Sequence, residues 1–231
     1  FVPTGAPLIF GSASALSDVT FTNDINLGAA VRPITINENG NTGADYTTMT
    51  GVLSGTGGEL FKNGAGILRL TGANTYTGTT SVDAGSLVVT SLGSSTGAST
   101  SSVGAGGVAM TNSNAIVLGN ATTTGGILVY AGSGETSDRK IRLRGTTAAN
   151  QIHADGSGPL ILTNVAHDTT EFGDKTLSLR GNNTAGNMIT SQLTNNSTGV
   201  LSVSVDGGAT WILTNNANSY SGGTRLAGGR A

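Results

Sequence analysis

Thirty-seven of the 231 residues are glycine, 24 are charged (11 basic and 13 acidic), and none is cysteine. The absence of glycine at every third position excludes collagen, the scarcity of good helix formers excludes a long helical array, and the net charge of −2 argues against disorder. Without cysteine there are no disulfides and no thiolate sites. The near-zero net charge gives no general attraction to nucleic acid, and no run of 18 apolar residues exists to insert into a membrane.

Short apolar bursts separated by Gly, Asn, Ser and Thr follow one another along the whole chain. They occupy residues 8–10, 19–21, 34–36, 60–61, 67–70, 87–89, 116–118, 127–130, 141–143, 160–162, 177–179, 201–205 and 211–213. Several alternate with polar residues, as a half-buried strand requires. Spacings of about 8–12 residues with turn residues between them are typical of an all-β protein.

A long internal repeat indicates which all-β fold is present. Residues 34–43 recur as 177–186, and residues 70–78 recur, with one extra residue, as 213–222. The offset from Ile34 to Leu177 is almost the same as the offset from Tyr76 to Tyr220. We therefore relate residues 34–89 to residues 177–231 as a super-repeat of about 143 residues that holds several strands.

A right-handed parallel β-helix explains this pattern better than a sandwich. A sandwich would need charged residues to protect its edges, and this chain has few. In a β-helix each turn, or rung, pairs with the next one, so that edges remain only at the two ends. At roughly 20–25 residues per rung, residues 1–231 are expected to form one elongated domain of about ten rungs.

Residues 63–89, NGAGILRLTGANTYTGTTSVDAGSLVV, resemble the autotransporter-associated β-strand repeat, or passenger-associated transport repeat, of Gram-negative surface proteins. Residues 207–229 resemble it less closely, because they contain the extra residue. The positions that carry the resemblance are Gly66, Leu70, Asn74, Tyr76, Gly78 and Gly85 in the first copy and Leu213, Asn218, Tyr220, Gly222 and Gly229 in the second. We expect the two tyrosines to close a turn over a corner of the rung.

The resemblance implies an exported passenger, that is, a structural or adhesive β-helical stalk that is secreted or held at the cell surface. The repeat carries no catalytic residue, so the resemblance implies neither an enzyme nor a cofactor. Neither end of the sequence reads as a polar cap, so we expect unpaired strands at both ends. We therefore predict either that copies associate end to end into a fibre or that the chain is part of a longer array of turns.

The densest acidic stretch supplies Asp168, Glu171 and Asp174. Carboxylates of this kind are suitable ligands for Ca²⁺, and paired carboxylates can act as acid and base in polysaccharide cleavage. The intervals between Asp138, Asp155 and Asp174 are both close to one expected rung, a spacing compatible with stacking on one face. The alternative is that these acidic residues lie in a solvated loop and bind nothing. The absence of the calcium-binding nonapeptide pattern favours this alternative. We predict no metal or catalytic site and keep a polysaccharide lyase or hydrolase as the alternative function.

A basic stretch near the middle of the chain is a second candidate surface. With Ile141 and Leu143 inward, Lys140, Arg142 and Arg144 project together from the opposite face of a strand. Such a face could contact a surface polysaccharide, which would make the chain a glycan-binding module, or it could simply be solvated. Aromatic residues are not interleaved with these cations, so nucleic acid is not an expected partner.

Overall fold

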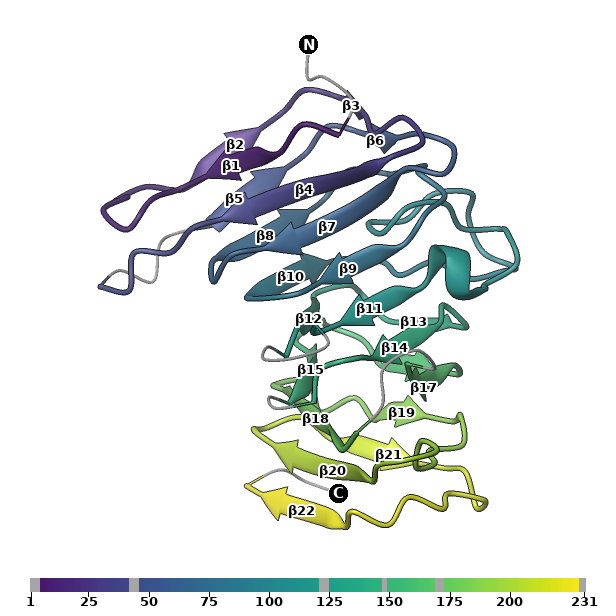
Figure 1. The fold of residues 1–231 in the computed structure, drawn as a ribbon. Coiled ribbons are helices and arrows are strands. Elements are labelled where there is room, and N and C mark those ends of the chain that lie inside the picture. The colour runs from purple at the N-terminus through teal and green to yellow at the C-terminus, as the bar shows by residue number, and fades with distance from the viewer. Residues whose placement is uncertain (1–4, 42–45, 121–124, 147–148, 169–172, 229–231) are drawn as a thin grey trace.

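The chain winds into a stack of turns whose named strands pair in parallel (Figure 1). The computed structural model describes residues 5–41, 46–120, 125–146, 149–168 and 173–228. Strands β1–β3 lie at one end of the stack and β21–β22 at the other (Figure 1). No helix within these ranges is long and apolar enough to cross a bilayer. The predicted all-β fold, a parallel β-helix, is confirmed.

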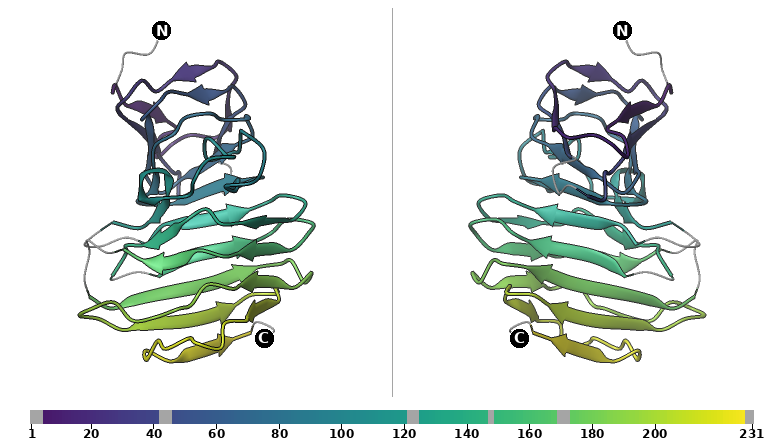
Figure 2. Two further views of the ribbon diagram at one scale, coloured as in Figure 1. Left: turned by 90° about the vertical axis from the view of Figure 1, so that its right-hand side faces the viewer. Right: turned by 90° about the vertical axis from the view of Figure 1, so that its left-hand side faces the viewer.

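The strands form a long sheet, a shorter sheet and a broken third side, which Figure 2 shows from two directions. The long sheet contains β2 (Val19–Phe21), β5 (Tyr46–Met49), β8 (Ile67–Leu70), β10 (Ser86–Val89), β12 (Ile127–Tyr130), β15 (Asn150–Ala154), β18 (Lys175–Gly181), β20 (Leu201–Asp206) and β22 (Thr224–Ala227). The second sheet contains β1 (Leu8–Phe10), β4 (Val31–Ile36), β7 (Glu59–Asn63), β9 (Thr80–Val82), β11 (Ile116–Leu118), β14 (Ile141–Leu143) and β17 (Val165–His167). The third side contains the pair β3 (Ile25–Asn26) and β6 (Leu53–Ser54), and then β13 (Glu135–Ser137), β16 (Leu160–Leu162), β19 (Asn187–Ile189) and β21 (Trp211–Leu213). Within the described ranges the long sheet has nine strands, one per turn, so the expected count of about ten rungs is not confirmed.

The core is a set of side-chain columns that run across the strands. Parallel pairing without slippage places equivalent positions on top of one another, and alternation sends every second residue inward. One column of the long sheet runs through Val19, Thr47, Leu68, Leu87, Leu128, Ile152, Leu179, Val205 and Leu226. Of these nine residues only the two end members are exposed, Val19 by 36% and Leu226 by 56%. Each interior residue is therefore buried by its two neighbouring turns.

Buried asparagines join neighbouring turns on the third side. The side chain of Asn74 accepts from Leu53 N–H (2.7 Å) one turn earlier and donates to the carbonyl of Ser102 (2.7 Å) one turn later. Asn187 does the same with Leu160 N–H (3.0 Å) and the carbonyl of Thr210 (2.9 Å). These amides satisfy backbone groups at positions where the strand ladder is interrupted.

A buried arginine holds the long connection between β10 and β11, which includes the 3₁₀ turn η1 (Asn112–Asn114). The guanidinium of Arg139 donates to the carbonyls of Leu92 (2.8 Å), Asn114 (2.8 Å) and Ala105 (2.7 Å). The carboxylate of Glu135 also accepts from Leu92 N–H (2.5 Å). Arg139 therefore has a structural role, because it provides hydrogen-bond donors for backbone carbonyls in a segment that has no regular strands.

A second buried cation, Lys62 on β7, lies in the N-terminal half of the stack. Its ammonium donates to the carbonyls of Asn63 (3.0 Å), Gly64 (2.7 Å) and Ala84 (2.8 Å). Burial lowers the pKa of Lys62 from 10.5 to about 7, and the nearby negative charge of Glu38 partly opposes this shift. The proton on Lys62 is thus bound less tightly in the folded chain than in the unfolded chain.

We expect Lys62 to make stability depend on pH. Between pH 7 and 10.5 the unfolded chain keeps the proton that the folded chain has released, so the free energy of unfolding rises with pH across this window. Urea unfolding midpoints at a series of pH values across the window measure the effect. The Lys62→Met variant should lack this contribution. Equal pH dependence in the variant and the parent chain would contradict the prediction.

Candidate functional site: a polar groove on the long sheet

Asp168 of the acidic stretch and two arginines of the basic stretch form one ion cluster. Asp168 Oδ1 lies 2.7 Å from Arg142 Nη2, and Asp168 Oδ2 lies 3.0 Å from Arg144 Nε. The Asp168 side chain is fully buried, while that of Arg142 is 11% exposed and that of Arg144 27%. Two of the three cations on the predicted basic face therefore have an internal counter-ion. A contact between Lys140, Arg142, Arg144 and a polyanion stays a prediction.

The two acidic candidates for a metal site that the structure describes, Asp168 and Asp174, each have partners of their own. Asp168 is engaged by two arginines, and Asp174 Oδ1 accepts from Val200 N–H (2.9 Å) on the next turn. Glu171 lies outside the described residues. In the part of the chain that the structure describes, no three His, Cys, Asp or Glu side chains are grouped so that they could hold a metal ion.

The three aspartates do not stack on one face, although their spacing was compatible with stacking. Equivalent positions on neighbouring turns in this region, such as Ile152 and Leu179, are further apart in sequence than consecutive aspartates, so each aspartate interval is shorter than one turn. Asp138 follows β13, Asp155 follows β15 and Asp174 precedes β18, so the three lie at different corners. Asp138 instead accepts from the backbone N–H (2.8 Å) and hydroxyl (2.5 Å) of Ser95 in the long connection.

The tyrosines of the two repeat copies make the same contact. The hydroxyl of Tyr76 lies 2.6 Å from Thr80 Oγ1, and the hydroxyl of Tyr220 lies 2.6 Å from Thr224 Oγ1. The asparagine two residues before each tyrosine accepts an N–H from the preceding turn: Asn74 from Leu53 (2.7 Å) and Asn218 from Leu193 (2.8 Å).

The repeat glycines and leucines lie at the corners and in the core. Gly85 has φ +65°, and an added Cβ would lie 2.5 Å from the carbonyl oxygen of Gly66, so this corner excludes other residues. Gly78 N–H donates to Gly58 (2.9 Å) and Gly222 N–H to Leu201 (2.9 Å) on the preceding turn. Leu70 is fully buried, whereas Leu213 is partly buried. Gly229 lies outside the described residues.

The two copies occupy different sides of the β-helix. The first runs from β8 on the long sheet to β9 on the second sheet, whereas the second runs from β21 on the third side to β22 on the long sheet. The related segments 34–36 and 177–179 are displaced in the same way, because β4 belongs to the second sheet and β18 to the long sheet. The repeat therefore specifies a corner of the chain rather than a fixed face of the stack.

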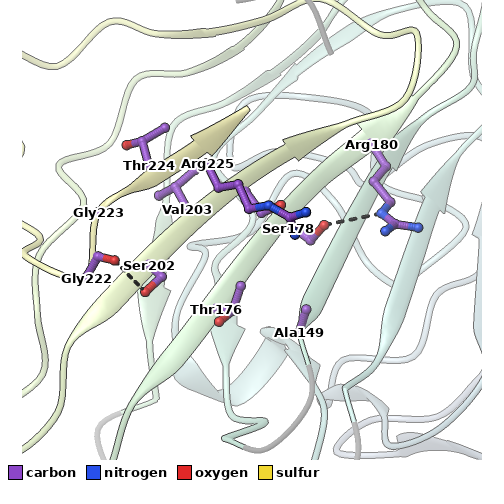
Figure 3. Close-up of a pocket in the computed structure, with 11 residues that line it drawn as sticks. Ala149, Thr176, Ser178, Arg180, Ser202, Val203, Gly222, Gly223, Thr224 and Arg225 are labelled. Carbon is purple, nitrogen blue, oxygen red and sulfur yellow. Dashed lines mark hydrogen bonds between the residues drawn. The ribbon is translucent and has the colours of Figure 1, made fainter. Parts of the chain in front are cut away.

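A groove of about 480 Å³ lies on the outer face of the long sheet, across β18, β20 and β22 (Figure 3). Its lining includes the outward hydroxyl side chains Thr176, Ser178, Ser202 and Ser204, the cations Arg180 and Arg225, and the small residues Ala149, Gly222 and Gly223, together with Val203 and Thr224, which occupy inward positions of their strands. None of the described residues that line it carries a carboxylate. The groove forms because the outward serine and threonine side chains on these strands are short, whereas the side chains of Arg180 and Arg225 beside them are long.

The arginine at one side of the groove is held by its neighbours. Arg180 Nε donates to the hydroxyl of Ser178 (3.3 Å), and Arg180 Nη2 lies 2.8 Å from Asp206 Oδ2. The hydroxyl of Ser202 on β20 donates to the carbonyl of Gly222, just before β22 (3.0 Å), a contact drawn in Figure 3. The arrangement offers guanidinium and hydroxyl groups to an oxygen-rich ligand.

Arg180 also borders a smaller hollow of about 210 Å³ lined by His153, Asp155 and Asp206. Both carboxylates are engaged, Asp155 by Asn182 N–H (2.9 Å) and Asp206 by Arg180. His153 Nε2 lies 2.9 Å from the side-chain oxygen of Gln151, and burial lowers the pKa of His153, which favours the neutral imidazole. These contacts give no support to the alternative of a polysaccharide lyase or hydrolase at this position.

Comparison with known proteins agrees with the geometry of the corners. Residues 60–89 and 205–230 match the passenger-associated transport repeat. A stretch of 94 residues, 40% of this chain, is 37% identical to the adhesin BmaC autotransporter of Brucella suis biovar 1 (strain 1330), of which it spans only 3%. No solved structure matches the chain. The chain thus carries the passenger-associated transport repeat of autotransporter passengers, which are secreted or displayed at the cell surface.

Proposed function

We propose that the chain is a stalk segment of an adhesive passenger on a bacterial cell surface. The observation that carries the proposal is the transport repeat, which occurs twice and forms the same Tyr–Thr and Asn–backbone contacts each time. The similarity to a protein named as an adhesin supports the adhesive role. Each turn is stabilised mainly by the turns on either side of it. A stack of this kind can be lengthened by adding turns, as a stalk requires.

Surface labelling tests this proposal. An antibody raised against the recombinant chain should label intact cells of the source bacterium or detect the protein in the culture medium. The soluble recombinant chain should also reduce attachment of those cells to their substrate by competition. Labelling confined to lysed cells, or attachment unaffected by a saturating amount of the chain, would contradict the proposal.

We further propose that the two ends of this stack are contact surfaces, covered either by another copy in an end-to-end contact or by further turns of a longer array. The support is the column of inward side chains that begins at Val19 and ends at Leu226, because these two are exposed while the residues between them are buried. Strands β2 and β22 each pair with only one neighbour in the described residues. A head-to-tail contact would pair the two strands and cover both apolar ends, and repetition of this contact would give a fibre.

Sedimentation velocity and negative-stain electron microscopy of the recombinant chain test end-to-end association. We expect elongated oligomers that grow with concentration. Leu226→Lys should shift the population to monomers, because it places a charge on the free edge. Val108→Lys alters a residue of similar exposure in the long connection and should have no effect. Monomers of the parent chain at every concentration, or equal effects of the two variants, would overturn association between copies and favour the longer array.

A further inference from the structure

We propose that the groove on β18, β20 and β22 binds an acidic polysaccharide, meaning a chain of sugar units that carry carboxylate groups. The ligand would lie along the axis of the stack, across the strands. This inference rests on the proposed adhesive function, for which it names a ligand class and a surface. The second copy of the transport repeat covers four lining residues, 222–225, but assigns them no ligand.

The charge of the groove selects an anion. Its lining within the described chain includes two arginines and no carboxylate. Arg225 is exposed, and among the described residues it makes no hydrogen bond or ion pair. Arg180 uses Nε and Nη2 on Ser178 and Asp206, which fixes the plane of its guanidinium beside the groove. A planar guanidinium matches a carboxylate better than an ammonium group does, because it can offer two parallel N–H groups.

The floor of the groove selects a sugar rather than a peptide. Ser178 and Ser204 are aligned in register, as are Thr176 and Ser202 one pair earlier, so the hydroxyls form two short rows at the strand spacing of about 4.8 Å. A hydroxyl both donates and accepts, as sugar hydroxyls also do. A peptide strand adds at the edge of a sheet, whereas this groove lies on its outer face: β18 and β20 are paired on both sides, and the free edge of β22 lies at the end of the stack. Aromatic residues are absent from the lining that the structure describes, so stacked nucleic-acid bases have no platform.

The groove is better prepared for an anion than the basic strand predicted from the sequence. Arg142 and Arg144 both face the buried carboxylate of Asp168, so an anionic ligand would have to compete with an internal partner. Arg225 has no such partner among the described side chains, and Arg180 is paired with Asp206 at a partly exposed position. An anion therefore meets less competition at the groove.

The chain contains a single tryptophan, Trp211, which serves as a reporter of the groove. Trp211 is buried on β21, and its indole N–H donates to the backbone carbonyl of Arg180 (3.0 Å). A ligand that moves the Arg180 segment should therefore change the fluorescence of Trp211. Titration calorimetry provides a second readout that does not depend on this contact.

The test titrates the recombinant chain with polygalacturonate at low and high salt, with fully methyl-esterified polygalacturonate as the uncharged probe. We expect salt-sensitive binding of the acid and none of the ester. Arg225→Gln should weaken binding about tenfold, because it removes a charged hydrogen-bond donor. Ser204→Phe should abolish binding by filling the groove while both arginines remain. Lys140→Gln removes one positive charge from the basic strand and should leave binding unchanged.

Three results would overturn the proposal: no binding at low salt, equal losses for Arg225→Gln and Lys140→Gln, or full competition by inorganic phosphate at the concentration of uronate units. The last result would show a site for a lone anion rather than a polysaccharide. Circular dichroism of each variant checks that its fold is retained. If binding fails while surface labelling and competition of attachment succeed, the adhesive function stands and only this ligand assignment falls.

Discussion

Replacing Asp168 with asparagine is expected to lower the free energy of unfolding by about 3–5 kcal/mol, the usual cost of breaking a buried ion pair by removing one partner. The carboxylate is fully buried and contacts Arg142 at 2.7 Å and Arg144 at 3.0 Å. Asparagine keeps the shape of the side chain but removes the charge that compensates both guanidinium groups. Two cations would then lie close together without the carboxylate that bridges them, and repulsion between them would add to the lost hydrogen bonds.

Asp206 provides the matched control for Asp168. It also pairs with an arginine at 2.8 Å, but its side chain is 36% exposed and that of Arg180 is 42% exposed. Water screens such a pair, so Asp206→Asn should change the free energy of unfolding by about 0–1 kcal/mol. Urea unfolding followed by circular dichroism measures both variants. Similar losses for the two variants would contradict the prediction that burial makes the Asp168 ion pairs contribute more to stability than the exposed Asp206 pair.

The alternation of apolar residues predicts the strands well but not their alignment. In residues 201–205 the apolar side chains point inward and the two serines outward, because the side-chain period of a strand is two. The length of a turn is not constant, however. The equivalent positions Leu87 and Leu128 are much further apart in sequence than Leu68 and Leu87, because the connection held by Arg139 lies in that turn. A fixed rung length therefore misplaces residues that lie far apart in sequence.

The same problem of alignment separates the predicted site from the observed one. Sequence alternation places Arg142 outward, opposite Ile141 and Leu143, as observed. It does not reveal that Asp168, one turn later, reaches the same point. The groove was missed for a related reason: Arg180 and Arg225 belong to different turns, and only the register of Ser178, Ser204 and Arg225 brings them to one surface.

Truncating Tyr76 to alanine is expected to lower the free energy of unfolding by about 3–5 kcal/mol, as for other large buried side chains. The ring is fully buried, and an added Cβ on Gly104 of the following turn would lie 3.0 Å from it. The backbone carbonyl of Tyr76 accepts from the N–H of Ala105 (2.8 Å), which follows Gly104 on that neighbouring turn. Burial raises the pKa of the hydroxyl above its usual range, although the Thr80 contact and Arg139 oppose this shift. The phenol therefore stays neutral, and Tyr76→Phe should cost about 1–2 kcal/mol for the lost hydrogen bond.

A comparison with Tyr220 distinguishes two contributions to stability: the local contacts of the repeat motif, and the packing of the next turn over the tyrosine. It makes the same 2.6 Å contact with a threonine four residues later, but it is only partly buried, near the exposed end of the column at Leu226. Tyr220→Ala should therefore lower the free energy of unfolding far less than Tyr76→Ala, since stability in a stack comes from contacts between neighbouring turns. Hydrogen exchange of Ala105 N–H, measured beside urea unfolding, should accelerate only in Tyr76→Ala. Equal losses for the two alanine variants would show instead that the local hydroxyl pair, and not the turn above it, carries the stability of this motif.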